Sequence, residues 1–243
     1  MGRALVTGAG QRLGHYARSA AGADAVVAEL EGMGRKAVAL QTDLLNEVET
    51  QALLSQAAKA LGGPITCLIN NASIFEYDTV STATQASWHR HMGSNMRAPF
   101  VLTQAMAAQG LSADTDSAGE PRAVGLILNM IDQRVRKLTP EFMTYTLAKM
   151  GLWAMTQTTA QALAPAIRVN AIGPGPTMQG HRQSDSHFEA QRHSTVLGRG
   201  ANPDDISAAL GYFLDAPAVT GQLLCVDGGQ HLGWQTPDVL GVE

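Results

Sequence analysis

The sequence has few charged residues and no long apolar segment, and both absences restrict what this protein binds. Charged residues make up 16% of the 243 positions, the formal net charge is −4, and no run of basic residues occurs. Binding to nucleic acids and to membrane surfaces depends on such basic patches. A membrane-spanning helix needs about 18 consecutive apolar residues, and the chain has no such run. We therefore predict neither a nucleic-acid partner nor a membrane partner.

Cysteine is scarce as well. Cys67 and Cys225 lie inside apolar, strand-like runs, and we interpret them as unpaired thiols of a reducing compartment. The N-terminal segment lacks the layout of a signal peptide, which favours a cytoplasmic protein. His181, His187 and His193 are spaced by six, so they do not share one face of a helix, and we predict no metal site.

What the sequence does contain is a regular alternation of apolar strands and amphipathic helices, with 45% hydrophobic residues and 25 glycines. Repeated strand–helix units predict a parallel sheet covered by helices on both faces, a Rossmann-like doubly wound α/β fold in a single domain, 1–243. Ligands of such folds bind at the carboxyl ends of the strands. The predicted strands are 4–7, 36–41, 64–70, 123–130, 167–171 and 222–226, and the predicted helices are 20–33, 46–61, 84–108, 145–163 and 202–214.

Two polar segments interrupt this alternation. Residues 112–122 are rich in Gly, Asp and Ser and are predicted to form a surface loop. Residues 178–200 carry scattered His and Gly with little periodicity, and we predict a mobile loop that contacts the substrate.

The first glycine-rich turn, Thr7 to Gly14, follows a short apolar strand, which is typical of a phosphate-binding turn. The chain then departs from the expected pattern, because Gly14 runs straight into His15 and the next helix. A strand-to-strand crossover takes at least about 10–12 residues. The first helix and the second strand, roughly 16 residues, are thus missing between Gly14 and His15. Either residues are omitted from the sequence or the deletion is real, in which case cofactor binding would be poor or lost.

Tyr145 and Lys149 are four residues apart on a predicted helix, so both side chains project from the same face. An ammonium beside a phenol favours the phenolate, so we expect a lowered pKa for Tyr145. Such a tyrosine exchanges a proton with a carbonyl or an imine while a hydride moves. The pattern is short, however, and on its own it also occurs by chance.

A series of motifs runs along nearly the whole chain, in the order Thr7-Gly8…Arg12…Gly14, His15-Tyr16-Ala17-Arg18-Ser19, Asp43, Asn70-Asn71-Ala72-Ser73-Ile74-Phe75, Asn95, Tyr145-x-x-x-Lys149, Pro174-Gly175 and Asp227-Gly228-Gly229. This order resembles the short-chain dehydrogenase/reductase family. Within that family the chain looks most like pteridine reductases, because an aspartate, Asp132, stands thirteen residues before Tyr145 where most members have a serine.

The resemblance implies NADPH as the cofactor, with Arg18 and Ser19 at its 2′-phosphate and Lys149 at the nicotinamide ribose. The alternative for Arg18 is a solvated charge at the start of a helix, and the alternative for Asp43 is a cap of the next turn. The further cofactor positions that the resemblance implies are Gly8, Arg12, Leu13, Gly14, His15, Asp43, Leu44, Asn71, Ala72, Ser73, Pro174 and Gly175.

The resemblance also implies the catalytic and substrate positions. Asp132, Tyr145, Lys149 and Asn95 are implied to be catalytic, with Asn95 anchoring a water relay towards Lys149. The implied substrate positions are Arg12, Ser73, Phe75, Asp132, Tyr145 and Pro176.

Phe75 would stack on a flat ring, although core packing explains it equally well, and Asn95 is otherwise an ordinary polar helix residue. Because a carboxylate accepts hydrogen bonds from N–H groups, Asp132 favours a nitrogen heterocycle such as a pterin, with reduction of a C=N bond. Asp132 is otherwise a cap of its loop. A reductase of another ketone or imine, and a non-catalytic binding protein, are the alternatives. The family pattern further implies a homotetramer.

Overall fold

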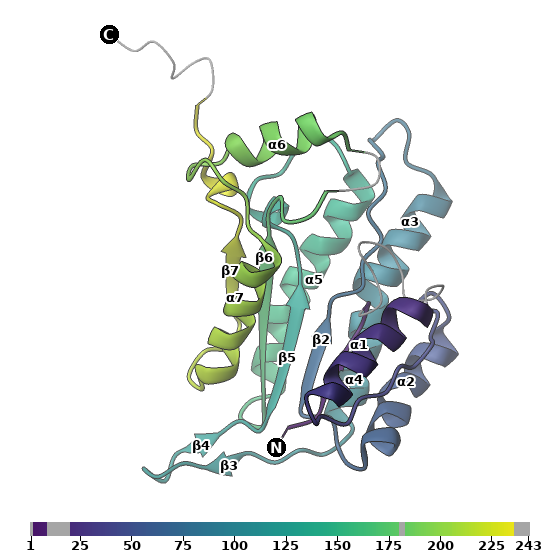
Figure 1. Ribbon diagram of the computed structural model, residues 1–243, viewed down its shortest axis with the longest axis vertical. Helices are drawn as coiled ribbons and strands as arrows, with labels where there is room; N and C mark the ends of the chain where they lie inside the picture. The colour runs from purple at the N-terminus through teal and green to yellow at the C-terminus, as the bar shows by residue number, and fades with distance from the viewer. Residues whose placement is uncertain (1, 9–19, 180–182, 236–243) are drawn as a thin grey trace.

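The computed structural model describes residues 2–8, 20–179 and 183–235. Its main sheet has five parallel strands in the order β1-β2-β5-β6-β7, which confirms the predicted parallel α/β fold (Figure 1). The strands are β1 (Ala4–Val6), β2 (Cys67–Asn70), β5 (Gly125–Met130), β6 (Ile167–Pro174) and β7 (Leu223–Val226).

Helices cover both faces of this sheet because its strands bury alternate side chains on opposite sides. On one face Ile127 and Val169 pack with Leu53 and Leu102, which come from two helices. On the other face Leu126 and Leu128 pack with Phe213. The α-helices are α1 (Ala20–Gly32), α2 (Glu47–Leu61), α3 (Gln85–Met92), α4 (Ala98–Ala107), α5 (Met143–Ala162), α6 (Asp185–His193) and α7 (Pro203–Asp215).

The predicted strand at 36–41 is wrong, since none of the described strands pairs with this segment. The reason lies in the short connection before it. Thirteen residues, 7–19, separate β1 from α1, too few for a helix and a strand. β1 is consequently the last strand on its side of the sheet. A cavity of about 790 Å³ lies between β1, α1 and residues 35–40. A further strand in this place would pair with segment 36–41.

Three other segments differ from the prediction. The expected long helix at 84–108 contains a π-helical turn, Gly93–Arg97, between α3 and α4. Pro99 follows this turn and has no N–H to donate to an earlier carbonyl. The predicted loop 112–122 holds a two-stranded ribbon of β3 (Asp114–Thr115) and β4 (Pro121–Arg122). Segment 178–200 includes helix α6, so it is not a loop without regular structure.

The carboxyl ends of the parallel strands meet at one edge of the sheet. In Figure 1 the strands β2, β5, β6 and β7 point towards the upper end of the molecule, where α6 lies, and the β3–β4 ribbon is at the opposite end. Over the described residues, no helix has the length and apolarity that crossing a membrane demands. The candidate site residues that follow these strands are therefore gathered at the α6 end.

Candidate active site

The ends of β1 and β2 are tied together by Thr7. Its hydroxyl oxygen accepts the backbone N–H groups of Asn71 and Ala72, each at 3.0 Å. The Asn71 amide donates to the Thr7 carbonyl oxygen at 3.1 Å. Gly8 has φ +74°, and a Cβ at this position would meet the Ala72 Cα at 3.0 Å. Because Gly8 carries no side chain, the backbone at this position lies directly against the start of the loop after β2, as a close backbone approach to a phosphate-bearing ligand requires.

Tyr145 and Asp132 form the centre of the site. Asp132 follows β5, Tyr145 lies in the first turn of α5, and the Tyr145 hydroxyl donates to Asp132 Oδ2 at 2.9 Å. Asp132 Oδ1 accepts the Arg134 backbone N–H at 2.8 Å, so this carboxylate also caps its own loop. The Lys149 ammonium donates to the Met130 carbonyl oxygen at 2.7 Å, and its Nζ lies 5.6 Å from the Tyr145 ring centroid.

The predicted lowering of the Tyr145 pKa is wrong. Burial and the neighbouring Asp132 carboxylate raise the pKa of Tyr145 well above its usual value, and the Ser73 hydroxyl opposes this with a hydrogen bond. Burial also raises the pKa of Asp132, and it lowers the pKa of Lys149 to about 8. The Tyr145 phenol donates a hydrogen bond to the Asp132 carboxylate, and its raised pKa means that it keeps its proton. Tyr145 is therefore present as the protonated phenol, the form that can act as a proton donor.

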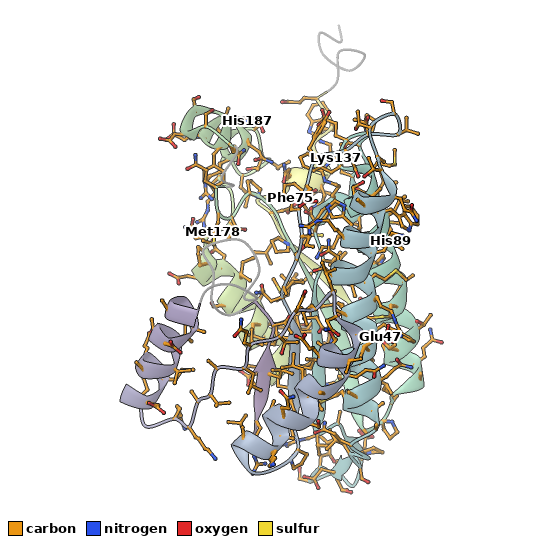
Figure 2. The ribbon with its side chains drawn as sticks, turned by 90° about the vertical axis from the view of Figure 1, so that its right-hand side faces the viewer. Glu47, Phe75, His89, Lys137, Met178 and His187 are labelled. Carbon is orange, nitrogen blue, oxygen red and sulfur yellow. The ribbon has the colours of Figure 1, made fainter. Side chains whose placement is uncertain are left out.

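An aromatic group lies next to this pair. Phe75 is 52% exposed, and its ring stacks on that of Phe142 with centroids 4.4 Å apart and planes 7° from parallel. The Phe75 ring also meets the Tyr145 ring edge-on, at 4.7 Å. The Arg134 guanidinium lies 5.0 Å from the Phe142 centroid. Figure 2 places Phe75 in the same half of the molecule as Lys137 and the α6 residue His187.

Asn95 pairs with the backbone rather than with the side chain of Tyr145 or Lys149. Its amide accepts the Ile74 N–H and donates to the Ile74 carbonyl oxygen, both at 2.8 Å. The residue lies in the π-helical turn and is fully buried. It thus fixes the loop that carries Ser73 and Phe75. The predicted water relay towards Lys149 stays a prediction.

The segment after β6 closes another side of the site. A Cβ on Gly175 would lie 2.5 Å from Asp227 Cβ, so the Pro174–Pro176 chain passes directly against the loop after β7. Arg192 of α6 donates to the carbonyl oxygens of Pro176 and Ala201, at 2.8 and 2.7 Å. Sequence reasoning missed Arg192, because nothing in a polar segment marks one arginine as an anchor for distant carbonyl groups.

Sequence reasoning also missed a buried polar group beneath the aromatic rings. Asp78, His91 and Thr144 are 2%, 0% and 2% exposed and are joined by hydrogen bonds. They come from a loop, from α3 and from α5. No spacing in the sequence connects positions 53 and 66 residues apart, so only the fold reveals the group.

Some predicted cofactor positions have a different role or lie outside the described residues. Asp43 Oδ1 accepts the Leu45 N–H at 2.9 Å, so Asp43 does cap the turn before α2; its contact with the adenine, beside Leu44, stays a prediction. Among residues 2–8, 20–179 and 183–235, no group of three His, Cys, Asp or Glu side chains is arranged to hold a metal ion. The positions outside the described residues are Arg12, Leu13, Gly14, His15, Arg18 and Ser19.

The described residues fit a dinucleotide at its nicotinamide end. The cavity beside β1 is lined mainly by apolar side chains of α1, α2 and segment 36–40, which fits the place of an absent strand, and Gly8, Leu44 and Ala72 are among its lining residues. Lys149 is 2% exposed, and the described residues supply its three-donor ammonium with one hydrogen-bond acceptor, leaving donors for ribose hydroxyls.

Comparison with known proteins agrees with this geometry. The sequence model of a family described as enoyl-(acyl carrier protein) reductase matches residues 4–231. An uncharacterised oxidoreductase of Methylorubrum extorquens is 31% identical over 223 residues, covering 88% of this chain and 85% of the relative.

A second relative, galactitol 2-dehydrogenase of Agrobacterium fabrum, is 29% identical over 258 positions, and the match spans 97% of the relative's length. The match spans 94% of this chain, or about 228 of 243 residues, so about 30 of the 258 positions have no counterpart here.

Among solved structures, the FolM alternative dihydrofolate reductase 1 of Brucella canis, in complex with NADP, is 37% identical. It superposes with a TM-score of 0.87 and covers 98% of this chain and 97% of its own.

Proposed function

The chain belongs to the short-chain dehydrogenase/reductase family, and we propose that it is an NADPH-dependent reductase of a pterin- or dihydropterin-like C=N bond. The cofactor assignment rests on the NADP bound in the FolM structure and on the fit of Lys149 and of the Gly8 turn. The substrate class rests on the chemistry of the Asp132–Tyr145 pair.

The observation that carries the proposal is the 2.9 Å hydrogen bond from Tyr145 to Asp132. A serine in this place would donate a hydrogen bond to a ketone oxygen, whereas a carboxylate accepts from the N–H groups of an amino-substituted ring. Phe75 adds an exposed aromatic face next to Tyr145, on which a flat ring stacks. Both features select a planar nitrogen heterocycle over an alcohol or an aliphatic ketone.

Reduction of a C=N bond needs a hydride at carbon and a proton at nitrogen. NADPH, when bound, supplies the hydride. Tyr145 gives the proton to the ring nitrogen, because its raised pKa keeps it protonated at neutral pH. Before the substrate binds, Asp132 accepts the hydrogen bond of the Tyr145 hydroxyl. In the transfer this proton turns from Asp132 to the ring nitrogen, and Asp132 accepts an N–H of the ring in its place. Lys149, on the same face of α5 as Tyr145, would hold the ribose, with its ammonium fixed by the Met130 carbonyl oxygen.

The experiment is NADPH oxidation followed at 340 nm with dihydropterin and dihydrofolate, beside aliphatic ketones and keto sugars. We expect turnover of the pterins, and a loss of about 10²- to 10⁴-fold in Tyr145→Phe. Asp132→Ser, which restores a hydroxyl donor, should lower kcat/KM for pterins and raise it for ketones. Turnover of ketones alone by the wild type would refute the pterin assignment.

One observation favours a non-catalytic protein instead. The thirteen residues between β1 and α1 are too few for both a helix whose N-terminus would face the pyrophosphate and the strand that would follow it. A ligand present at 100 times its Kd stabilises a protein by about 2.7 kcal/mol. A thermal-shift series with NADPH and NADP⁺ that shows no stabilisation at millimolar concentration would favour this alternative.

We also propose self-association into a tetramer through α3, α4 and α5. Trp88, Phe100 and Leu147 on these helices are 43%, 38% and 43% exposed, large apolar side chains that a partner subunit would cover. Light scattering after size exclusion measures the mass directly. A monomeric mass at micromolar concentration would contradict the proposal.

A further inference from the structure

The first turn of α5 is capped by a residue from a distant loop. Phe142 occupies the N-cap position with φ 54° and ψ 47°, and its side chain makes no capping hydrogen bond. Asp78 takes over this role. Its Oδ1 accepts the Thr144 backbone N–H at 3.0 Å, and its carbonyl oxygen accepts the Met143 N–H at 3.2 Å. The carboxylate of Asp78 thereby satisfies donors that a helix start leaves open.

His91 extends this cap into a chain of hydrogen bonds with a defined direction. The Glu76 backbone N–H donates to His91 Nε2 at 3.1 Å, so the ring proton is on Nδ1. Nδ1 lies 2.7 Å from Thr144 Oγ1 and donates to it. The Thr144 hydroxyl in turn donates to Asp78 Oδ2 at 2.5 Å. Each polar atom of the three side chains has a partner that matches its role.

Burial makes this arrangement sensitive to the loss of one partner. Burial lowers the pKa of His91, even though Asp78 and Glu76 oppose the shift, which keeps the ring neutral. Burial would raise the pKa of Asp78, but the hydrogen bonds from Thr144 outweigh it and hold that pKa below its usual value. An ionised Asp78 at the start of α5 also interacts favourably with the helix dipole.

The three residues join the two halves of the candidate site. On one side Asp78 and the Glu76 N–H belong to the loop that carries Phe75. On the other side Thr144 directly precedes Tyr145 and lies two residues after Phe142, whose ring stacks on Phe75. The His91 ring itself meets the Tyr145 ring edge-on at 5.9 Å.

We propose that Asp78 and His91 are positioning residues, which act through Thr144 to fix the Phe75–Phe142 ring pair at a set distance from the Tyr145 hydroxyl. This inference rests on the proposed function in one respect, that the ring pair supports a planar substrate during proton transfer. The geometric part, that the network couples the loop to the helix, does not depend on the substrate.

A matched pair of variants tests the network. Thr144→Val keeps the shape of the side chain but removes the hydroxyl, which leaves His91 Nδ1 and Asp78 Oδ2 without their partner, while Thr144→Ser keeps the hydroxyl. The control is Thr158→Val, a threonine on the exposed face of α5 whose hydroxyl bonds only within its helix. Amide hydrogen exchange, followed by mass spectrometry without any substrate, reports on both segments.

We expect faster exchange in residues 74–78 and 142–146 of Thr144→Val, and wild-type exchange in Thr144→Ser and Thr158→Val. If Thr144→Val does not fold, His91→Leu, which leaves the Asp78 cap in place, is compared with His91→Gln, whose amide both donates and accepts. Unchanged exchange in these two segments would overturn the proposal.

Kinetics then separate positioning from general support of the fold. In Thr144→Val we expect kcat/KM for the ring substrate to fall about 10- to 100-fold, since a displacement of about 1 Å costs this much. We expect NADPH affinity to change less than threefold. A loss of NADPH affinity as large as the loss of kcat/KM would overturn the proposal as well. Absence of pterin turnover in the wild type would refute the proposed function alone, because the exchange experiment still decides the network.

Discussion

Lys149→Met should change how the stability of this protein depends on pH. Lys149 is 2% exposed, and burial lowers its pKa from 10.5 to about 8. A lowered pKa means that the folded state disfavours the charged form. The pKa difference of about 2.5 units between the unfolded and the folded state corresponds to roughly 3 kcal/mol. The free energy of unfolding is lower by this amount when the Lys149 ammonium is charged.

The sign follows from linkage. Below about pH 8 the lysine is charged in both the folded and the unfolded chain, and the penalty is fully present. Between about pH 8 and 10.5 the folded protein releases its proton first, so the unfolded state binds more protons and stability rises with pH. From about pH 7 to pH 9.5 this gain amounts to about 2 kcal/mol in the wild type, and it is absent in Lys149→Met.

Urea unfolding at these two pH values measures the effect. The quantity to compare is the difference in unfolding free energy between the wild type and Lys149→Met. In this difference the contributions of titrating groups that the substitution does not affect cancel. At a single pH the hydrogen bond to Met130, worth about 1–3 kcal/mol, offsets part of the difference, so the change with pH is the decisive quantity. Lys59→Met, which removes an exposed ammonium on α2, gives the baseline. The reasoning would be refuted if the difference in unfolding free energy between the two proteins were the same at both pH values, or if the wild type lost stability relative to Lys149→Met at the higher pH.

Two further substitutions test the first turn and the core. Gly8→Ala puts a Cβ 3.0 Å from Ala72 Cα at φ +74°, so we expect about tenfold weaker NADPH binding by fluorescence titration; unchanged affinity would show that the turn does not approach the cofactor. Phe213→Ala empties a 1% exposed position between α7 and the sheet, and urea unfolding should show a loss of about 3–5 kcal/mol. A loss below about 1 kcal/mol would mean that the cavity collapses.

Much of the helical and strand pattern was predictable because it is local. Asn202 and Pro203 predicted the start of α7, and the structure confirms both as the N-cap and the first helical residue. The spacing of Tyr145 and Lys149 predicted a shared helix, which α5 provides. The prediction of a strand at 36–41 was wrong for a non-local reason, since a strand forms only where a neighbouring strand pairs with it.

For the candidate site, the sequence predicted that Asp132 follows a strand and that Tyr145 lies on a helix, but not the electrostatics of the pair. Asp132 and Tyr145 were named from their positions in the sequence, and the structure joins them at 2.9 Å. The pKa of Tyr145 is raised, opposite to the prediction, because burial and the Asp132 carboxylate outweigh the Arg134 charge and the Ser73 hydrogen bond, which lower it. Distance and burial are properties of the folded chain, and no spacing along the sequence contains them.

The sequence by itself determined the alternating fold, the shared helix of Tyr145 and Lys149, and the shortened connection after the first turn. Periodicity, caps and covalent length act over a few residues, so the chain carries them without reference to its fold. Only the tertiary structure decided that Asp78, His91 and Thr144 meet, that Phe142 stacks on Phe75, and that Tyr145 keeps its proton. These outcomes depend on which distant segments are packed together and on how much water the packing excludes, and both are fixed only when the sheet and its helices are assembled.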